Sequence, residues 1–221
     1  MNIIVSNEIK QVCPSFVGAC VEAQVVNTKY SAALWDEIHA QEERFRRELT
    51  TDSLKEQPGI AATRAVYKKC GKDPSRYRPA SEALIRRMLQ GKELYQKDTL
   101  VDLVNLASIA YGYSIGGFDA DRFAGDTLTL GIGREDEPYE GIGRGKLNIA
   151  GLPVYRDEQG GVGTPTSDHE RTKMTLATRH LVVLVNGYDG DERRVMANAV
   201  YIQQLLRKYA HSDGGTVMLY K

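Results

Sequence analysis

The hydrophobic period of the sequence changes near residue 119, and this change limits the folds that the chain can adopt. Between residues 31 and 112 apolar side chains recur every three or four positions, which is typical of amphipathic helices. From residue 126 to 163 short alternating runs are interrupted by glycines, which indicates hairpins. Because helices and strands do not follow one another as repeated β–α–β units, the sequence predicts an α+β fold.

Five helices are expected, and several of their ends carry recognisable signals. For one helix Ser81 is a candidate N-cap and Gly91 a C-terminal stop, and for the next helix Asp98 is the N-cap and Gly112 the stop. The helix that begins at Ser81 has an apolar stripe of Leu84, Ile85, Met88 and Leu89. The expected helical ranges are 31–49, 59–71, 81–91, 98–112 and 191–209.

Strands are expected where valine and isoleucine are concentrated, at 2–11, 16–26, 180–188 and 216–220. The tetrapeptide GIGR occurs at 131–134 and again at 141–144. Neither copy opens a helix as a phosphate-binding loop does, so the pair is interpreted as two arms of one hairpin. No low-complexity linker divides the chain, and we expect a single domain over residues 1–221.

Composition narrows the functional classes. The formal net charge is zero, which argues against a broad basic coat for DNA or other nucleic acid. The three cysteines have no CxxC spacing and fit free thiols in a reducing cytoplasm. No run of about 18 apolar residues is present and the first residues lack signal-peptide features, so we expect a cytoplasmic protein without membrane contact.

The charges are unevenly distributed along the chain. Residues 61–100 contain ten Lys and Arg against four Asp and Glu, whereas residues 101–140 contain two against eight. Such asymmetry fits a basic face for phosphates beside an acidic pocket. Two solvated surfaces explain it as well, and the charge pattern alone favours that simpler interpretation.

The segment TPTSDHERT, residues 164–172, is the first candidate site. It places Asp168, His169 and Glu170 in a loop shaped by glycine and proline. The four histidines lack metal-binding spacing and no nucleophile motif is present, so we expect neither a metal nor another cofactor. General acid–base catalysis that positions a water against an ester is one interpretation, and a solvated charged turn is the other.

Two further places carry unusual polar residues. Asn105 lies in an otherwise apolar helix, three residues after Asp102, and fits either a structural hydrogen bond or a ligand contact. In PSRYRP, residues 74–79, Arg76 and Arg78 flank Tyr77 between prolines. This arrangement suits an RNA phosphate-and-base contact, and a surface turn explains it equally well.

These three places, in this order, resemble the B-three/B-four domain of the phenylalanyl-tRNA synthetase beta subunit, and still more the freestanding proteins made of that domain alone. The resemblance is carried by RYRPASEALIRRML, LVDLVNLASIAYGYSIGGFDADRFAGD, LNIAGLP and SDHERTKMT. It extends over about residues 15–220. The resemblance implies one α+β domain, a sandwich of mixed β-sheets with flanking helices.

The resemblance also implies a function. The family domain hydrolyses tyrosine mischarged onto tRNA, so this chain is expected to be a trans-acting aminoacyl-tRNA deacylase with charged or mischarged tRNA as its partner. It lacks a synthetase core and is not a complete ligase. The alternative is a non-catalytic tRNA-binding or adaptor module. Hydrolysis of a small free aminoacyl compound is a third, weaker possibility.

Site residues follow from the same resemblance. Glu170 matches the family's catalytic glutamate and Asn105 lines the pocket, while Gly116 replaces the family's histidine beside Gly117. The family's Gly-Gly pair before the glutamate is Asp168-His169 here. These departures predict a wider, more acidic pocket in which Asp119, Asp168 and Glu170 converge. Since a cation relieves carboxylate repulsion, we expect a substrate with a polar or basic side chain.

Overall fold

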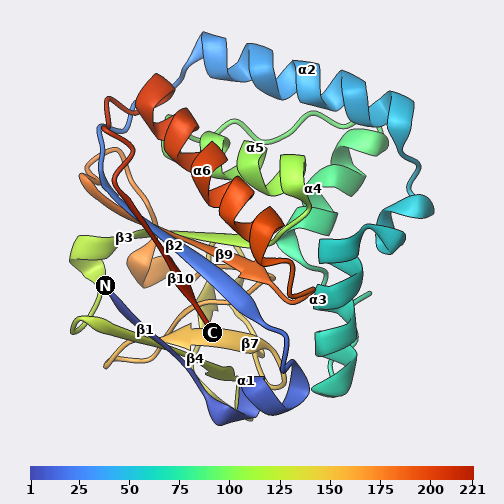
Figure 1. Cartoon of the computed structure of the whole chain (residues 1–221), viewed down its shortest axis with the longest axis vertical. Helices are drawn as coiled ribbons and strands as arrows, with labels where there is room; N and C mark the ends of the chain where they lie inside the picture. Colours follow the sequence, from blue (N-terminus) through green and yellow to red (C-terminus); the bar gives the residue numbers. More distant parts are fainter.

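Two four-stranded sheets and one short hairpin form the β structure of the protein, in a computed structural model that describes all residues 1–221 (Figure 1). The first sheet is antiparallel, in the order β10 (Thr216–Tyr220), β2 (Val17–Gln24), β9 (His180–Gly187) and β3 (Ile115–Asp119). The second sheet has the order β1 (Asn2–Val5), β4 (Thr127–Ile132), β7 (Pro153–Arg156) and β8 (Gly161–Gly163). Its β1–β4 pair is parallel, so this sheet is mixed. The hairpin joins β5 (Glu140–Gly141) to β6 (Gly145–Lys146).

Helices α5 (Thr99–Tyr111) and α6 (Glu192–Tyr209) cover the face of the first sheet that points away from the second (Figure 1). Helices α2 (Ala32–Glu48) and α4 (Ala80–Leu89) pack in turn against α5. Helix α3 (Pro58–Lys69) stands at one side of the layers, and α1 (Asn7–Val12) lies at the end of the second sheet (Figure 1). Three short 3-10 turns complete the elements, at Ser53–Glu56, Ala120–Arg122 and Glu170–Thr172.

The alternating sides of the central strands create two hydrophobic cores. Val183 and Val185 of β9 belong to the 31-residue core beneath the helices, while Val182 and Leu184 belong to the 17-residue core between the sheets. Because both faces of β9 are covered, its sequence is continuously apolar rather than alternating. The predicted α+β sandwich with flanking helices is therefore confirmed.

The expected helix signals are largely confirmed. The Asp98 side chain accepts a hydrogen bond from Val101 N–H, and α5 ends at Gly112 in the left-handed conformation, with φ of 73°. Ser81 is not a cap, because α4 begins one residue earlier and the Ser81 hydroxyl instead bonds that of Ser114 over 3.2 Å.

Two strand predictions are wrong. Only Asn2–Val5 of the range 2–11 is a strand, since the Ser6 side chain accepts a hydrogen bond from Ile9 N–H and begins α1. The two GIGR copies are not arms of one hairpin. The first ends β4, where Gly131 pairs with Val154, and the second forms the turn between β5 and β6.

None of the helices is both long and apolar enough to cross a membrane. The single-domain boundary at 1–221 stays a prediction.

Candidate functional site at the edge of the first sheet

The segment that follows β8 links all three sheets. Asp168 forms a β-bridge with Gly163 of the second sheet, and His169 forms one with Gly141 of the hairpin. Lys173 then bridges to Phe118 on β3, the edge strand of the first sheet. The predicted TPTSDHERT loop is therefore a fixed crossing point between layers rather than a freely solvated turn.

Asp168 lies against the backbone of β3 with little around it to hold a charge. Its Oδ2 accepts a hydrogen bond of 3.2 Å from Gly117 N–H, and no cationic side chain pairs with it. Burial raises the pKa of this carboxyl to about 7, because the single amide does not replace the water that a carboxylate loses. Asp168 therefore exchanges a proton near neutral pH.

Glycines make room for this carboxyl. A Cβ atom at Gly116 would lie 3.3 Å from Asp168 Oδ1, and one at Gly163 would lie 2.9 Å from it. Both positions would also press on the Phe118 ring. Side chains here would displace Asp168 or Phe118, so the two glycines are needed for the observed packing.

The expected widening at Gly116 and Gly117 is not found. Both residues lie within strand β3 rather than in a turn, and their open sides face opposite directions. Phe118 and Asp168 occupy the space beside Gly116, while Met174 fills the space beside Gly117. The missing side chains are thus replaced by neighbours rather than by a hollow.

His169 is held in one orientation. Its Nδ1 accepts a hydrogen bond of 2.9 Å from Arg171 N–H, and its ring packs edge-on against Tyr139 at 4.9 Å. Burial and the nearby Arg171 charge lower the pKa of His169. The neutral ring therefore carries its proton on Nε2, because Nδ1 is the acceptor.

A cavity of about 730 Å³ adjoins His169 and Tyr139. Its wall contains Lys146 and three carboxylates, those of Asp136, Glu137 and Glu140. Glu137 is already paired with Arg156, at 2.6 Å between Oε1 and Nε, which leaves Asp136 and Glu140 as the unpaired acids. An acidic pocket is therefore present, but on a different set of residues from those expected.

The carboxylates expected to converge have separate partners. Asp119 Oδ2 accepts a hydrogen bond of 2.9 Å from the Thr178 hydroxyl and lies 3.6 Å from Arg122 Nε. Glu170 is half-buried and forms an ion pair with Lys173. Asp119 is paired with Arg122 and Glu170 with Lys173, so Asp168 is the only one of these three acids without a cationic partner.

The two polar residues of α5 differ in their surroundings. Asp102 is buried and accepts hydrogen bonds from Trp35 Nε1 at 2.8 Å and from Lys97 N–H at 3.1 Å, which is a structural role. Asn105 is half-buried, with no bonding partner in the chain, next to Val104, which approaches the open side of Gly117. Its amide is free for a ligand.

The predicted RNA-contact loop is divided between solvent and core. Arg76 is exposed, and its guanidinium carbon lies 5.8 Å from the centroid of the Tyr77 ring. Lys72 Nζ lies 3.9 Å from the centroid of the same ring. Arg78 is half-buried, with Nε 3.6 Å from the carboxylate of Glu82. The two arginines therefore have different environments although they are two residues apart.

Several site residues could not be found by pattern. Gly163 and Tyr139 join the site only because the segment after β8 folds back on them: Asp168 bridges to Gly163, and Tyr139 contacts Ser167. Tyr139 donates a hydrogen bond of 2.7 Å to Ser167 O, and burial together with the Asp168 charge raises its pKa. No group of three or more His, Cys, Asp or Glu side chains is arranged to hold a metal ion.

Fold and site together define an α+β domain whose polar loop closes the edge of an antiparallel sheet. The model of one family, the B3/4 domain, matches residues 62–209, and the chain belongs to this family. An N-terminal fragment of the phenylalanyl-tRNA synthetase beta subunit from Pyrococcus horikoshii has a similar fold. The TM-score is 0.50 and the identity 14%, over 98% of this chain and 50% of that one.

At this identity the structural likeness concerns the fold alone, and the present chain spans half the length of that fragment. No curated protein matches the sequence. The resemblance to the synthetase domain expected from the sequence is thereby confirmed at the level of family and fold.

Proposed function

We propose that this protein is a cytoplasmic, trans-acting deacylase that hydrolyses the ester of an aminoacyl-tRNA. The observation that carries the proposal is Asp168, a carboxyl with a pKa of about 7 at the crossing of the three sheets. A general base is most effective when its pKa lies near the working pH, and this carboxyl meets that condition. Membership of the B3/4 family supports an RNA-related setting.

The chemistry asked of the site is modest. Asp168 accepts a proton from a water molecule as the water oxygen attacks the ester carbonyl. Collapse of the tetrahedral intermediate breaks the bond to the tRNA ribose oxygen, and that oxygen takes up a proton. The free amino acid and the tRNA hydroxyl are the products. An aminoacyl ester is already activated, so holding one water in place supplies much of the required acceleration.

Other residues then orient the substrate. The free amide of Asn105 is proposed to bind the aminoacyl group, and Glu170 is proposed to bind its α-ammonium group by exchanging its contact with Lys173. The unpaired acids of the cavity, Asp136 and Glu140, favour a polar or basic substrate side chain. Arg76 and Tyr77 are exposed or half-exposed and suit contacts with the acceptor end.

A deacylation screen tests the proposal. The protein is incubated with a panel of charged and mischarged tRNAs, including one that carries arginine and one that carries tyrosine. We expect ester hydrolysis above the spontaneous rate for at least one tRNA, with basic or polar amino acids preferred over tyrosine. Spontaneous rates across the whole panel would contradict the proposal.

A non-catalytic tRNA-binding module is the second candidate. It is favoured by Gly116, which stands where the related synthetases have a histidine, and by the bond from Asp168 to Gly117, which also serves to satisfy an edge amide. Such a module would bind deacylated tRNA without hydrolysing any ester. The same screen, run beside a binding assay, separates the two functions.

A further inference from the structure

Three arginines from two helices and a loop surround one buried carboxylate. Glu82 of α4 is 1% exposed, and its Oε2 lies 2.9 Å from Arg64 Nη1 on α3. Its Oε1 lies 3.3 Å from Arg86 Nη2 and 3.6 Å from Arg78 Nε. The side chains of the three arginines are 18–39% exposed, so each retains a path to solvent.

This cluster has more positive charge than the carboxylate balances. Three guanidinium groups face one carboxylate, which leaves an excess of two positive charges. The Nε atoms of Arg78 and Arg86 are buried and donate no hydrogen bond. Since like charges in a partly desolvated place repel one another, an anion that reaches the cluster from solvent would lower its energy.

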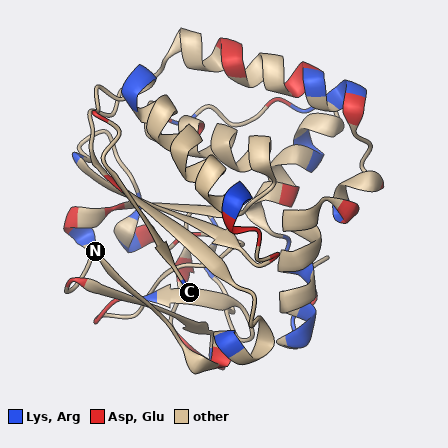
Figure 2. Cartoon of the chain, viewed as in Figure 1, with Lys and Arg blue, Asp and Glu red and all other residues tan.

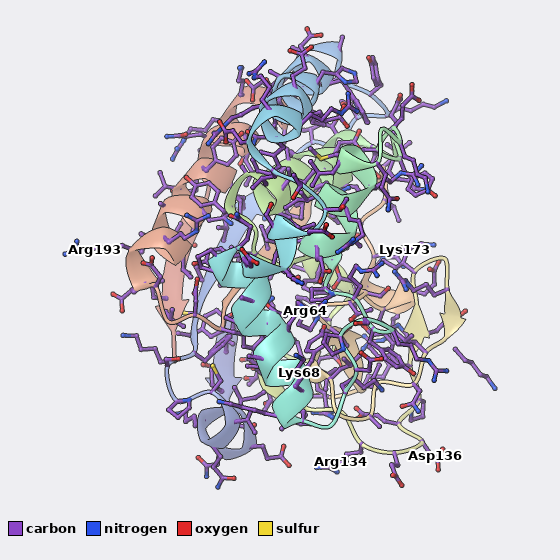
Figure 3. All side chains as sticks on the ribbon, turned by 90° about the vertical axis from the view of Figure 1, so that its right-hand side faces the viewer. Arg64, Lys68, Arg134, Asp136, Lys173 and Arg193 are labelled. Carbon is purple, nitrogen blue, oxygen red and sulfur yellow. The ribbon has the colours of Figure 1, made fainter.

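A hollow beside the cluster gives an anion access. Ala61, Arg64, Ala65 and Lys68 form one stripe of α3, and with Lys55 they line a cavity of about 240 Å³. The two alanines are small and leave space between the cations. Figure 3 shows Arg64 and Lys68 directed from the same side of α3. In Figure 2 the Lys and Arg residues mark the lower part of this helix, and no Asp or Glu occurs between Glu56 and Asp73.

The hollow is connected to the candidate site through backbone contacts. Ala80 N–H, at the start of α4, donates a hydrogen bond of 2.7 Å to Pro165 O. Thr166 donates from its hydroxyl to Tyr77 O, and its hydroxyl also lies 2.9 Å from that of Tyr67 on α3. Asp168 therefore lies two residues after Thr166, which contacts Tyr77 beside Arg78.

We propose that this surface, formed by Lys55, Arg64 and Lys68, binds the phosphodiester backbone of RNA. Arg78 and Arg86 add positive charge to it through the Glu82 carboxylate that they share with Arg64. Guanidinium groups match the oxygens of a phosphate, and a partly buried cluster binds it with less loss of side-chain freedom than exposed lysines do. The proposal rests on the deacylase function, because the neighbouring site then receives the acceptor end of the same RNA.

Binding of deacylated tRNA as a function of salt tests this surface. The wild type is compared with Arg64→Gln/Lys68→Gln and with Lys55→Gln/Lys68→Gln. Each double variant should lower the slope of log K against log salt by about 1 to 2 and weaken binding about ten-fold or more at 0.1 M salt. The second pair leaves Glu82 and its ion pairs untouched, so it stays informative if loss of Arg64 impairs folding.

Arg193→Gln is the matched control. Arg193 is exposed on α6, distant from α3 in Figure 3, and forms no ion pair. This substitution removes one positive charge, half of what each double variant removes, and should leave the salt slope nearly unchanged. A slope change equal to that of the double variants per charge removed would mean that net charge alone matters, and the proposed surface would be rejected.

A second substrate separates this inference from the deacylase function. An amino-acid ethyl ester has no phosphate, so both double variants should hydrolyse it at the wild-type rate while losing tRNA affinity. Unchanged tRNA binding in both variants overturns the phosphate surface but not the deacylase. Binding of poly-glutamate as tight as that of tRNA at equal charge would also overturn it, in favour of an acidic protein partner.

Discussion

Two carboxyl groups on either side of one loop contact, Glu82 and Asp168, have opposite surroundings. Glu82 lies within reach of three guanidinium groups, whereas Asp168 accepts one hydrogen bond from a backbone amide and meets no cation. The first lies within an excess of positive charge. The second has a pKa of about 7 and exchanges its proton. Burial raises the pKa of Asp168, and no cation lies near enough to offset that effect.

A third acid shows the intermediate case. Asp157 is buried, which by itself raises its pKa, but two hydrogen bonds of 2.9 Å from Arg171 and several from backbone amides outweigh burial and lower the pKa. Arg171 lies three residues after Asp168 and points to the other acid. Arg171, although it belongs to the same loop as Asp168, therefore pairs with Asp157, and Asp168 has no cationic partner.

The largest expected effect comes from removing the proton-accepting group. Asp168→Asn keeps an oxygen for Gly117 N–H but cannot take a proton, so kcat/KM for deacylation should fall by about 10² to 10⁴. Wild-type kcat/KM should rise with pH and level off above about 7. The measurement is single-turnover hydrolysis across pH 5 to 9. Asp36→Asn, on the exposed face of α2 and without an assigned role, is the control. An Asp168→Asn enzyme with near wild-type activity would remove Asp168 from the mechanism.

The Glu82 side of the comparison is tested by stability. Glu82→Gln leaves three partly buried guanidinium groups without their anion, and the free energy of unfolding should fall by about 3 kcal/mol. Denaturant titration followed by circular dichroism measures this change. Glu48→Gln breaks an exposed pair with Arg44 on α2 and should leave stability unchanged. If the two substitutions lowered the free energy of unfolding equally, Glu82 would contribute no more to stability than an exposed ion pair does.

Glu170 provides a smaller effect on activity. If Glu170 binds the substrate's ammonium group, Glu170→Gln should lower kcat/KM about ten-fold, or about 1.4 kcal/mol in transition-state binding. Its tRNA affinity should stay at the wild-type value, because the phosphate contacts lie elsewhere. Lys173→Gln, which frees Glu170 from its ion pair, should not lower activity. A loss of tRNA affinity in the glutamine variant would instead place Glu170 in RNA binding.

The smallest expected effect is the dependence of stability on pH at Asp168. Its pKa is raised in the folded state, so folding favours the protonated form, and this contribution is present below about pH 4 and lost as the pH rises through 7. Asp168→Asn should therefore be more stable than wild type by about 1 kcal/mol at pH 8, a value reduced by solvent screening of a half-buried group. The difference should vanish near pH 4. Thermal melts of both proteins at several pH values measure it, and a constant difference would refute the assigned titration.

Local patterns predicted most of the elements. The caps at Asp98 and Gly112 and the apolar run of β9 are properties of neighbouring residues, and they occur where expected. The error at Ser81 is one residue at the start of α4, whereas residues 7–12 form a whole helix, α1, in a range expected to be strand. The Ser6 side chain accepts a hydrogen bond from Ile9 N–H at the start of α1, and the Ser81 hydroxyl bonds that of Ser114, 33 residues away.

The family resemblance directed attention to the correct segment, but not to the distribution of its contacts. Asp119, Asp168 and Glu170 were expected to share one pocket, yet Thr178 and Arg122 bind the first and Lys173 binds the last. Arg122 and Lys173 each lie three residues after the acid that they pair with, whereas Thr178 reaches Asp119 across 59 residues. Residue order alone does not say which of these contacts forms.

The sequence by itself determined the α+β class, the family and the position of the polar loop, because periodicity and motif order are local properties of the chain. Tertiary structure alone decided which acid keeps its proton and where positive charge collects. Gly117 meets Asp168 across 51 residues of sequence, and Arg64 meets Glu82 across 18. Electrostatic energy depends on distance and solvent exposure in space, so the chemistry of both sites appears only when the layers pack.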